Sequence, residues 1–394
     1  MSKILELAEK YENDVANFLV DIVKIPSLSG QEKDVVERIG AEMKKVGFDE
    51  VWVDGLGSVV GRIGNGPFKL AFDAHIDTVD VGNRANWDFD PYDAHIKDGK
   101  VWGRGGADQK GGMASMVYAG KIIKELDLAK NCTIYMVGSV MEEDCDGLCW
   151  DYLIKEEKLK PDLCVLTEPT SLNIYRGHRG RMEIQVHTKG ISCHGSAPER
   201  GENAIYKMAN TVLGIEKLNE RITSDEFLGK GTVTVSEITS VSPSLCAVAD
   251  GASIHLDRRL TWGETEESAV KEVKEVVGFD KDATVAIPVY EGKGYTGKTF
   301  PMKKYYPTWK LPEEHEFVQT AMSSYKNVFK ADPKVDKWTF STNGVAIMGI
   351  NGVPCFGFGP GHEEQAHTPN EWTPVDHLVK ATAFYAQFAE EMSK

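Results

Sequence analysis

The sequence lacks the features that mark a membrane protein or a disulfide-rich secreted protein. No stretch approaches the roughly 18 consecutive apolar residues that a membrane-spanning helix needs. The first residues, MSKILELAEKYEND, contain no uninterrupted apolar run of the kind found in a signal peptide. The 7 cysteines are odd in number and form no CxxC pair, so a disulfide scaffold is not expected. We therefore predict a cytoplasmic protein without a membrane segment.

Positive charge is also scarce. The chain has 60 acidic and 45 basic residues and a net charge of −15, which argues against nucleic acid or an anionic membrane as partner. A hydrophobic content of 41% and a charged content of 27% are ordinary for a globular protein. At 394 residues the chain exceeds the roughly 250–300 residues of a single core, so two domains are expected.

The most informative stretch begins at Asp73 and ends at Glu168. Within it, apolar, strand-like runs repeatedly end in acidic or histidine residues, and one more histidine follows near the C-terminus. These residues are His75, Asp77, Asp108, Glu142, Glu143, Glu168 and His367. A lone HxD or EE pair is usually structural, but ligands bind at the carboxyl ends of strands in α/β sheets. Imidazole and carboxylate groups are zinc ligands, and two metals can share a water nucleophile. The joint pattern predicts a two-metal hydrolytic site.

Spacing within the pattern suggests a division of roles. His75 and Asp77 are two residues apart on a strand, so their side chains point the same way. One of them can bind a metal ion while the other holds that ligand in the right orientation. Asp108 lies between the other candidates in the sequence and could bridge both ions. Glu142 and Glu143 can diverge at the end of their strand, which would give one metal ligand and one general base.

These motifs resemble those of the di-zinc exopeptidase and deacylase family, over nearly the full chain. The segments HIDTV, WGRGGADQKGG, MEED and TEP and the late histidine carry the resemblance. Members include acetylornithine deacetylase, succinyl-diaminopimelate desuccinylase, glutamate carboxypeptidase and aminoacylase. The resemblance implies two Zn²⁺ per chain, with Co²⁺ or Mn²⁺ as alternatives. It implies one ion held by His75, Asp108 and Glu168 and the other by Asp108, Glu143 and His367, with Glu142 as general base and Asp77 orienting His75. In many members the bond corresponding to Asp108–Gln109 is cis.

Periodicity predicts an α/β protein with an inserted domain. Residues 3–25 show a helical stripe, and Ser29 with Glu32 reads as a capping box that begins the next helix. Strands and helices then alternate, and further strands are expected near 345–349 and 354–358. Residues 181–290 follow the order βαββαβ of a ferredoxin-like unit. Because His367 must join a site begun before residue 170, residues 181–290 are expected to be an inserted ferredoxin-like domain between two parts of a catalytic domain, 1–180 and 291–394. The resemblance implies that the catalytic domain is zinc-exopeptidase-like and that the inserted domain is the family's lid.

Three further residues are candidate site residues. In relatives, the lid histidine that matches His194 reaches a neighbouring subunit's active site and helps to hold the oxyanion, which implies a homodimer formed through the lids. Arg258 is the candidate for clamping a substrate carboxylate. Arg259 would point to the opposite strand face, so only one of the two is expected to act. Asn343 is expected at the rim of the substrate pocket.

The predicted activity is hydrolysis of an amide bond in a small substrate: an N-acyl amino acid, a dipeptide, or a ureido or carbamoyl compound. Glu142 would take a proton from the water shared by the metals and return it to the leaving amine. HIDTVDVG, WGRGGADQKGG and GHEEQAHTPNEW most resemble a branch found beside selenium-dependent molybdenum hydroxylases in bacterial purine breakdown. A ring-opened purine or ureido intermediate of purine catabolism is therefore an alternative substrate. Two different classes of function also fit paired metals: a phosphoesterase, and a catalytically silent metal-binding scaffold protein.

Overall fold

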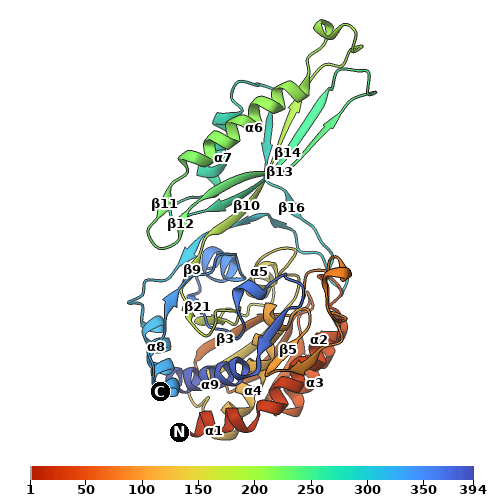
Figure 1. The fold of residues 1–394 in the computed structure, drawn as a ribbon. Helices are drawn as coiled ribbons and strands as arrows, with labels where there is room; N and C mark the ends of the chain where they lie inside the picture. Colours follow the sequence, from red (N-terminus) through yellow and green to blue (C-terminus); the bar gives the residue numbers. More distant parts are fainter. Residues whose placement is uncertain (1) are drawn as a thin grey trace. The chain divides into compact units, whose positions relative to one another are not determined.

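The computed structural model describes residues 2–394 and divides the chain into two compact units (Figure 1). The first contains residues 1–177, 291–300 and 310–394, and the second contains 178–290 and 301–309. The sequence had placed 301–309 in the first domain. They belong to the second because Tyr305–Tyr306 (β18) pairs with Gly180–Lys189 (β10) of that unit and Met302–Lys303 (β17) pairs with Val289–Tyr290 (β16). Among the described residues, no helix is long and apolar enough to cross a membrane.

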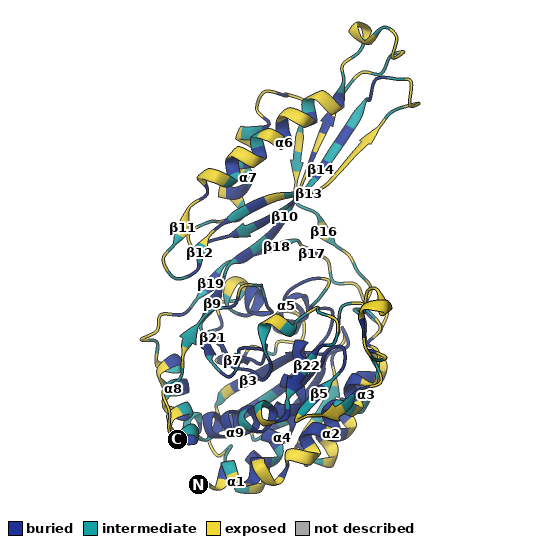
Figure 2. Cartoon of the chain, viewed as in Figure 1, coloured by how far each residue is buried: buried dark blue, intermediate teal, exposed yellow. Residues whose placement is uncertain are grey.

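The first unit is built on an 8-stranded sheet with the order β1-β2-β6-β3-β7-β21-β8-β20. Its strands are β1 (Glu50–Val53), β2 (Val59–Ile63), β6 (Cys132–Ser139), β3 (Phe68–His75), β7 (Leu163–Leu166), β21 (Cys355–Gly357), β8 (Ile174–Tyr175) and β20 (Val335–Asp336). The four strands β6, β3, β7 and β21 run parallel to one another, and they are almost wholly buried (Figure 2). Burial on both faces explains why they read as continuous apolar runs.

Helices cover both faces of this sheet. They are α1 (Lys3–Lys10), α2 (Glu12–Val23), α3 (Lys33–Lys45), α4 (Gly111–Leu126), α5 (Leu148–Lys155), α8 (Glu316–Phe329) and α9 (Val375–Met392). Successive residues of β3 show the two faces: the ring of Phe72 lies 5.4 Å from that of Tyr385 on α9, whereas Asp73 bonds Asn343 on the other face. A small sheet of β22 (Trp372–Pro374), β5 (Lys100–Trp102) and β4 (His95–Lys97) completes the unit.

The predictions for residues 3–25 and 345–349 of this unit are wrong. The stripe at 3–25 forms two helices, because the chain bends at Tyr11. Residues 345–349 are not a strand but belong to a short helical turn, Val345–Ile350, whose first three residues are buried. A short apolar run fits a buried helical turn as well as a buried strand, so periodicity could not separate the two.

The second unit is the ferredoxin-like domain predicted from its periodicity. Its strands are β10 (Gly180–Lys189), β13 (Thr232–Val241), β14 (Gly251–Leu260) and β15 (Thr284–Ala286), and its helices are α6 (Ala204–Arg221) and α7 (Glu266–Val276). The sheet has the antiparallel order β13-β14-β10-β15, with β18 also pairing β10. The core contains the inward residues of β10, such as Ile184 and Val186, packed with Met208 and Ile215 of α6 and Val273 of α7.

Candidate metal centre

The candidate site lies at the carboxyl edge of the parallel strands. β6, β3 and β7 are neighbours in the sheet and run in the same direction, so their C-terminal ends meet. His75 is the last residue of β3, Glu142 and Glu143 follow β6, and Glu168 follows β7. This edge is where open α/β sheets bind ligands.

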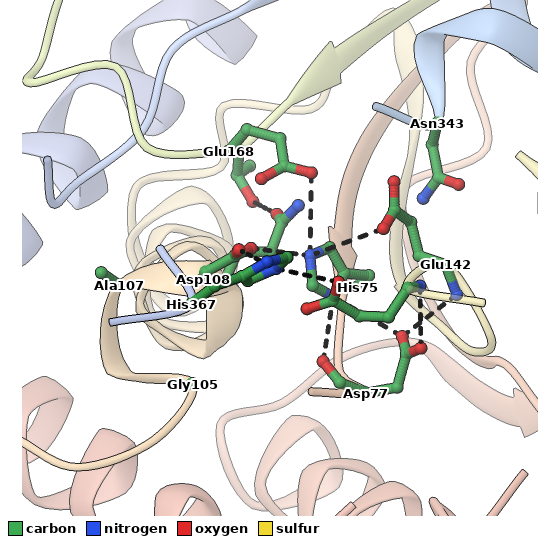
Figure 3. Close-up of polar contacts among 12 residues, drawn as sticks. His75, Asp77, Gly105, Ala107, Asp108, Glu142, Glu168, Asn343 and His367 are labelled. Atoms are coloured by element: carbon green, nitrogen blue, oxygen red, sulfur yellow. Dashed lines mark hydrogen bonds and ion pairs between the residues drawn. The ribbon is translucent and has the colours of Figure 1, made fainter. Parts of the chain in front are cut away.

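Two groups of three side chains share Asp108 (Figure 3). In the first, His75 Nε2 lies 2.9 Å from Asp108 Oδ1 and 3.8 Å from Glu168 Oε1. In the second, His367 Nε2 lies 3.3 Å from Asp108 Oδ2 and 3.0 Å from Glu143 Oε2. The ligand atoms of each group all lie within 4.8 Å of one another. Because Asp108 turns one oxygen toward each group, these five side chains could hold two ions with Asp108 as the bridge.

The environment of these side chains fits cations. Glu143 Oε1 and Glu168 Oε2 are buried and have no hydrogen-bond partner within residues 2–394. Burial, together with repulsion from Asp108, raises the pKa of Glu143 above its usual value and that of Glu168 well above it. Clustered buried carboxylates are costly unless positive charge compensates them. A pair of divalent ions would supply that charge and would satisfy the open oxygens, so the residues present fit the metals that the sequence predicted.

Glu142 lies beside the candidate metal ligands. It is buried, and its Oε2 lies 4.0 Å from His75 Nε2. Burial raises its pKa well above the usual value, and the charges of Asp146 and Glu168 add to the shift. A carboxyl group with a raised pKa can accept and return a proton near neutral pH.

Asp77 orients both sides of the site, partly in a way that the sequence did not predict. Its backbone carbonyl oxygen lies 3.0 Å from His75 Nδ1, while its carboxylate is farther from that nitrogen, at 3.5 Å. The carboxylate instead accepts hydrogen bonds from the backbone N–H groups of Glu142 at 3.2 Å and Glu143 at 3.0 Å. One residue therefore orients the His75 ring through its carbonyl group and the two glutamates through its side chain.

The capping box predicted at Ser29 is wrong, and its two residues support the site instead. Ser29 Oγ donates to Asp77 Oδ2 at 2.7 Å, and the helix begins only at Lys33. Glu32 is buried, and its Oε1 accepts from the backbone N–H groups of Gly30 at 2.9 Å and Met141 at 3.1 Å. Glu32 thus fixes the residue before Glu142, a function that sequence reasoning missed because the contact joins distant segments.

The Asp108 loop has the backbone geometry expected from the resemblance. The Asp108–Gln109 peptide bond is cis. Gly105 adopts φ +85°, in the left-handed region that favours glycine, and starts the turn that carries Asp108 toward the other ligands. The glycine-rich segment therefore shapes a ligand loop.

Arg258 does not present its guanidinium group to a substrate, contrary to the sequence prediction. Alternation along β14 places it on the same face as the buried residues Ile254 and Leu256. Its side chain is fully buried, and Nη2 donates to Glu264 and, at 2.7 Å, to Glu272 of α7. Arg259 lies on the opposite face, as the alternation predicted, and is partly exposed while paired with Asp257. Arg258 is therefore a structural ion-pair partner.

Asn343 is also not a rim residue. It is buried, and its Nδ2 donates to Asp73 Oδ2 at 2.8 Å and to Ser139 Oγ at 3.1 Å. Its Oδ1 accepts from the backbone N–H group of Gly147 at 2.9 Å and from Cys149 Sγ at 3.5 Å. Because the amide group uses all its bonding capacity inside the fold, Asn343 supports the strand ends beneath the site rather than binding substrate.

His194 lies in the second unit, in the exposed segment between β10 and α6. Its Nδ1 accepts from the backbone N–H group of Ser196 at 3.1 Å and lies 2.8 Å from Ser196 Oγ. Residue 194 also forms an isolated β-bridge with Ala247. These contacts all lie within the second unit, so the predicted role of His194 in catalysis stays a prediction.

Comparisons with known proteins find a matching family and similar chains. Residues 71–391 match peptidase family M20/M25/M40. The chain is 54% identical to the uncharacterized protein YgeY of Escherichia coli K12 over 384 residues, which cover 97% of this chain and 95% of that protein. It is 34% identical to a probable succinyl-diaminopimelate desuccinylase of Staphylococcus epidermidis ATCC 12228, over 95% of this chain and 96% of that protein.

Among solved structures, the fold resembles that of the YXEP protein of Bacillus subtilis, described as a dinuclear metal-binding peptidase from the M20 family. The TM-score is 0.71 at 13% identity, covering 98% of this chain and 99% of that chain. At this level of identity the likeness concerns the fold alone.

Proposed function

The chain belongs to peptidase family M20/M25/M40 and is a metal-dependent hydrolase of carbon–nitrogen bonds, and from this premise we propose its substrate class and mechanism. We propose that it cleaves the amide bond of a small N-acyl amino acid, dipeptide or ureido compound, with Glu142 as general base. The observation that carries the proposal is the division of Asp108 between two ligand groups, with buried Glu142 beside them. A catalytically silent scaffold would not need Glu142 in that place.

Five side chains would hold the metals: His75, Asp108 and Glu168 for one ion, and Asp108, Glu143 and His367 for the other. The mixed imidazole and carboxylate set suits Zn²⁺, with Co²⁺ or Mn²⁺ as alternatives. When bound, two such ions lower the pKa of a water molecule and polarise a carbonyl group.

The side chains of the protein then move the proton. Glu142 accepts a proton from the attacking water as the water oxygen bonds to the carbonyl carbon. It returns that proton to the amide nitrogen as the carbon–nitrogen bond breaks, which leaves an amine and a carboxylic acid, or a carbamic acid when the substrate is a ureido compound. Asp77 keeps Glu142 in reach because its carboxylate holds the backbone N–H group of Glu142. The raised pKa of Glu142 supports this double role.

Replacing Glu142 by Gln tests the mechanism. We expect turnover to fall by at least about 10²–10⁴-fold, the usual contribution of general acid–base catalysis, while both ions stay bound. Glu156→Gln, an exposed change of the same chemistry, is the control and should leave both properties unchanged. Retained turnover in Glu142→Gln, or loss of metal from it, would contradict the role assigned to Glu142.

The substrate class is tested by comparing kcat/KM among candidate substrates. The zinc-loaded enzyme would be assayed with N-acyl amino acids, dipeptides and ureido compounds under identical conditions, and kcat/KM compared. A preference for ureido compounds would support the alternative substrate, a ring-opened purine or ureido intermediate of purine catabolism. A clear preference for N-acyl amino acids would exclude that alternative.

We also propose that two copies of the chain associate through the second unit. β13 is an edge strand of its sheet, and an unpaired edge can add a strand from a second copy. Apolar side chains are exposed on it and on the neighbouring helix α6: Val241 is 66% exposed and Tyr206 73% exposed. In such a dimer, His194 of one chain would donate a hydrogen bond to the oxyanion in the partner's site.

Complementation between inactive variants tests the dimer and His194 together. His194→Ala and Glu142→Gln chains would each be inactive alone. If they are unfolded together and refolded, about a quarter of the sites should combine one intact Glu142 with one intact His194 from the other chain. Recovery of about a quarter of the wild-type activity supports the proposal. If no activity is recovered while sedimentation still shows a dimer, His194 does not act in the partner's site.

A further inference from the structure

Glu371 is a fully buried carboxylate whose side-chain bonds all go to the loop that carries Asp108. Its Oε1 accepts from the backbone N–H groups of Ala107 at 2.8 Å and Asp108 at 3.0 Å. Its Oε2 accepts from the backbone N–H group of Gly105 at 2.9 Å and from Arg104 Nη1 at 2.8 Å. Both oxygens are therefore saturated with donors from one short loop, and Glu371 itself is not free to bind substrate or metal.

The same residue is attached to the segment that carries His367. Glu371 is four residues after His367, and its backbone carbonyl oxygen accepts from the N–H group of Gly103 at 3.0 Å. The next residue, Trp372, pairs with Trp102 in the ladder between β22 and β5. Glu371 thus joins the His367 segment to the Asp108 loop, two parts of the chain that are more than 250 residues apart in sequence.

The two ligand groups depend differently on this junction. In the first group, His75 lies within β3 and Glu168 closely follows β7, so strand ladders of the central sheet hold them. In the second group, His367 lies in a loop, and its side chain is 54% exposed. The second group therefore has two of its three ligands on the segments that Glu371 joins, whereas the first group has only Asp108 there.

From this arrangement we propose that Glu371 is a positioning residue that sets Asp108 against His367, so that the second metal ion depends on it more than the first. The inference rests on the two-metal site of the proposed function. Substitutions of groups that orient metal ligands typically lower metal affinity by roughly 10–100-fold. We expect a loss in that range for the second ion in Glu371→Gln, because an amide group cannot accept from all four donors. The first ion should change by less than about threefold.

The experiment is a stepwise titration of the full-length protein, stripped with a chelator, with Co²⁺ in competition with a chromophoric chelator. The matched control is Glu42→Gln, because Glu42 is also buried and accepts from three donors: Arg38 at 2.8 Å, Lys45 at 3.0 Å and Tyr118 at 2.8 Å. It lies on α3 and bonds no ligand segment. Thermal unfolding of both variants separates general destabilisation from the selective loss of one ion. If Glu371→Gln does not fold, Arg104→Met removes one donor only and should weaken the same ion to a smaller degree.

The outcomes are distinct. Selective weakening of the second ion in the Glu371 variant, with both ions retained by Glu42→Gln, supports the inference. Equal weakening of both ions, or second-ion affinity within about twofold of wild type, overturns it. If the wild-type protein itself binds fewer than two ions, the proposed two-metal function fails first, and that result is visible before any variant is measured.

Discussion

The substitution Asn343→Ala tests the structural role of a residue that the sequence had placed at the substrate pocket. Removing the amide group leaves Asp73, which is buried, without the hydrogen bond from Nδ2 at 2.8 Å. It also leaves the backbone N–H group of Gly147 without its acceptor at 2.9 Å. Each buried polar group left unpaired costs about 1–3 kcal/mol, and more when it is charged. We therefore expect the free energy of unfolding to fall by about 3–5 kcal/mol.

The assay is thermal unfolding of the chelator-stripped protein, followed by circular dichroism. If the two units unfold separately, the relevant transition is the one that added zinc shifts upward, because the ligands belong to the first unit. A loss of this size lowers that midpoint by roughly 5–10 °C. Asn131→Ala is the control: its exposed side chain makes one bond, to the carbonyl oxygen of Ser393, and its loss should cost below about 1 kcal/mol.

Kinetics decide between the two roles of Asn343. A structural residue lowers the amount of folded enzyme and leaves the KM of the folded fraction near the wild-type value. A tenfold or greater rise in KM, with a free energy of unfolding within about 1 kcal/mol of wild type, would refute the structural assignment. It would support the prediction from the sequence that Asn343 lies at the rim of the substrate pocket.

Three further predictions concern other parts of the fold. Gly112→Ala should destabilise the first unit by more than about 2 kcal/mol, measured by urea unfolding, because the added Cβ would lie 2.2 Å from Thr167 Oγ1 and 2.6 Å from its carbonyl oxygen. Arg258→Ala should cost about 3–5 kcal/mol in the second unit, because it leaves the Glu264 carboxylate, whose side chain is only 9% exposed, without its cation. A large change in KM without that loss of stability would contradict this. Burial lowers the pKa of His377 to about 4 from 6.5, so the folded state favours the neutral ring, and the stabilisation present above pH 6.5 is lost as the pH falls toward 4. Between pH 7 and pH 5 the wild type should therefore lose about 1–2 kcal/mol relative to His377→Gln, and parallel pH profiles for the two proteins would disprove the shift.

Several candidate metal ligands could be picked out of the sequence because the signal for them is local, whereas the full set, with Asp108 and His367, was implied by the family resemblance. His75 ends an apolar strand, Glu142 and Glu143 follow another, and parallel strands in an α/β sheet bring such ends together. The βαββαβ order of the second unit was equally readable, because its strands alternate and its helices have a 3.6-residue period. These features depend on a few neighbouring residues and hold in almost any tertiary context.

Only the tertiary structure showed which polar groups hold the loops of the site in place without being candidate ligands themselves. Glu32 and Glu371 act by accepting hydrogen bonds from backbone N–H groups, which every residue except proline carries, so the sequence of the donor segment gives no sign of them. Alternation placed Arg258 and Arg259 on opposite faces of β14, but only the packing of α7 showed that the Arg258 face is covered. Asn343 was ambiguous for the same reason: an amide side chain suits a pocket rim and a buried network equally, and the burial around it makes the choice.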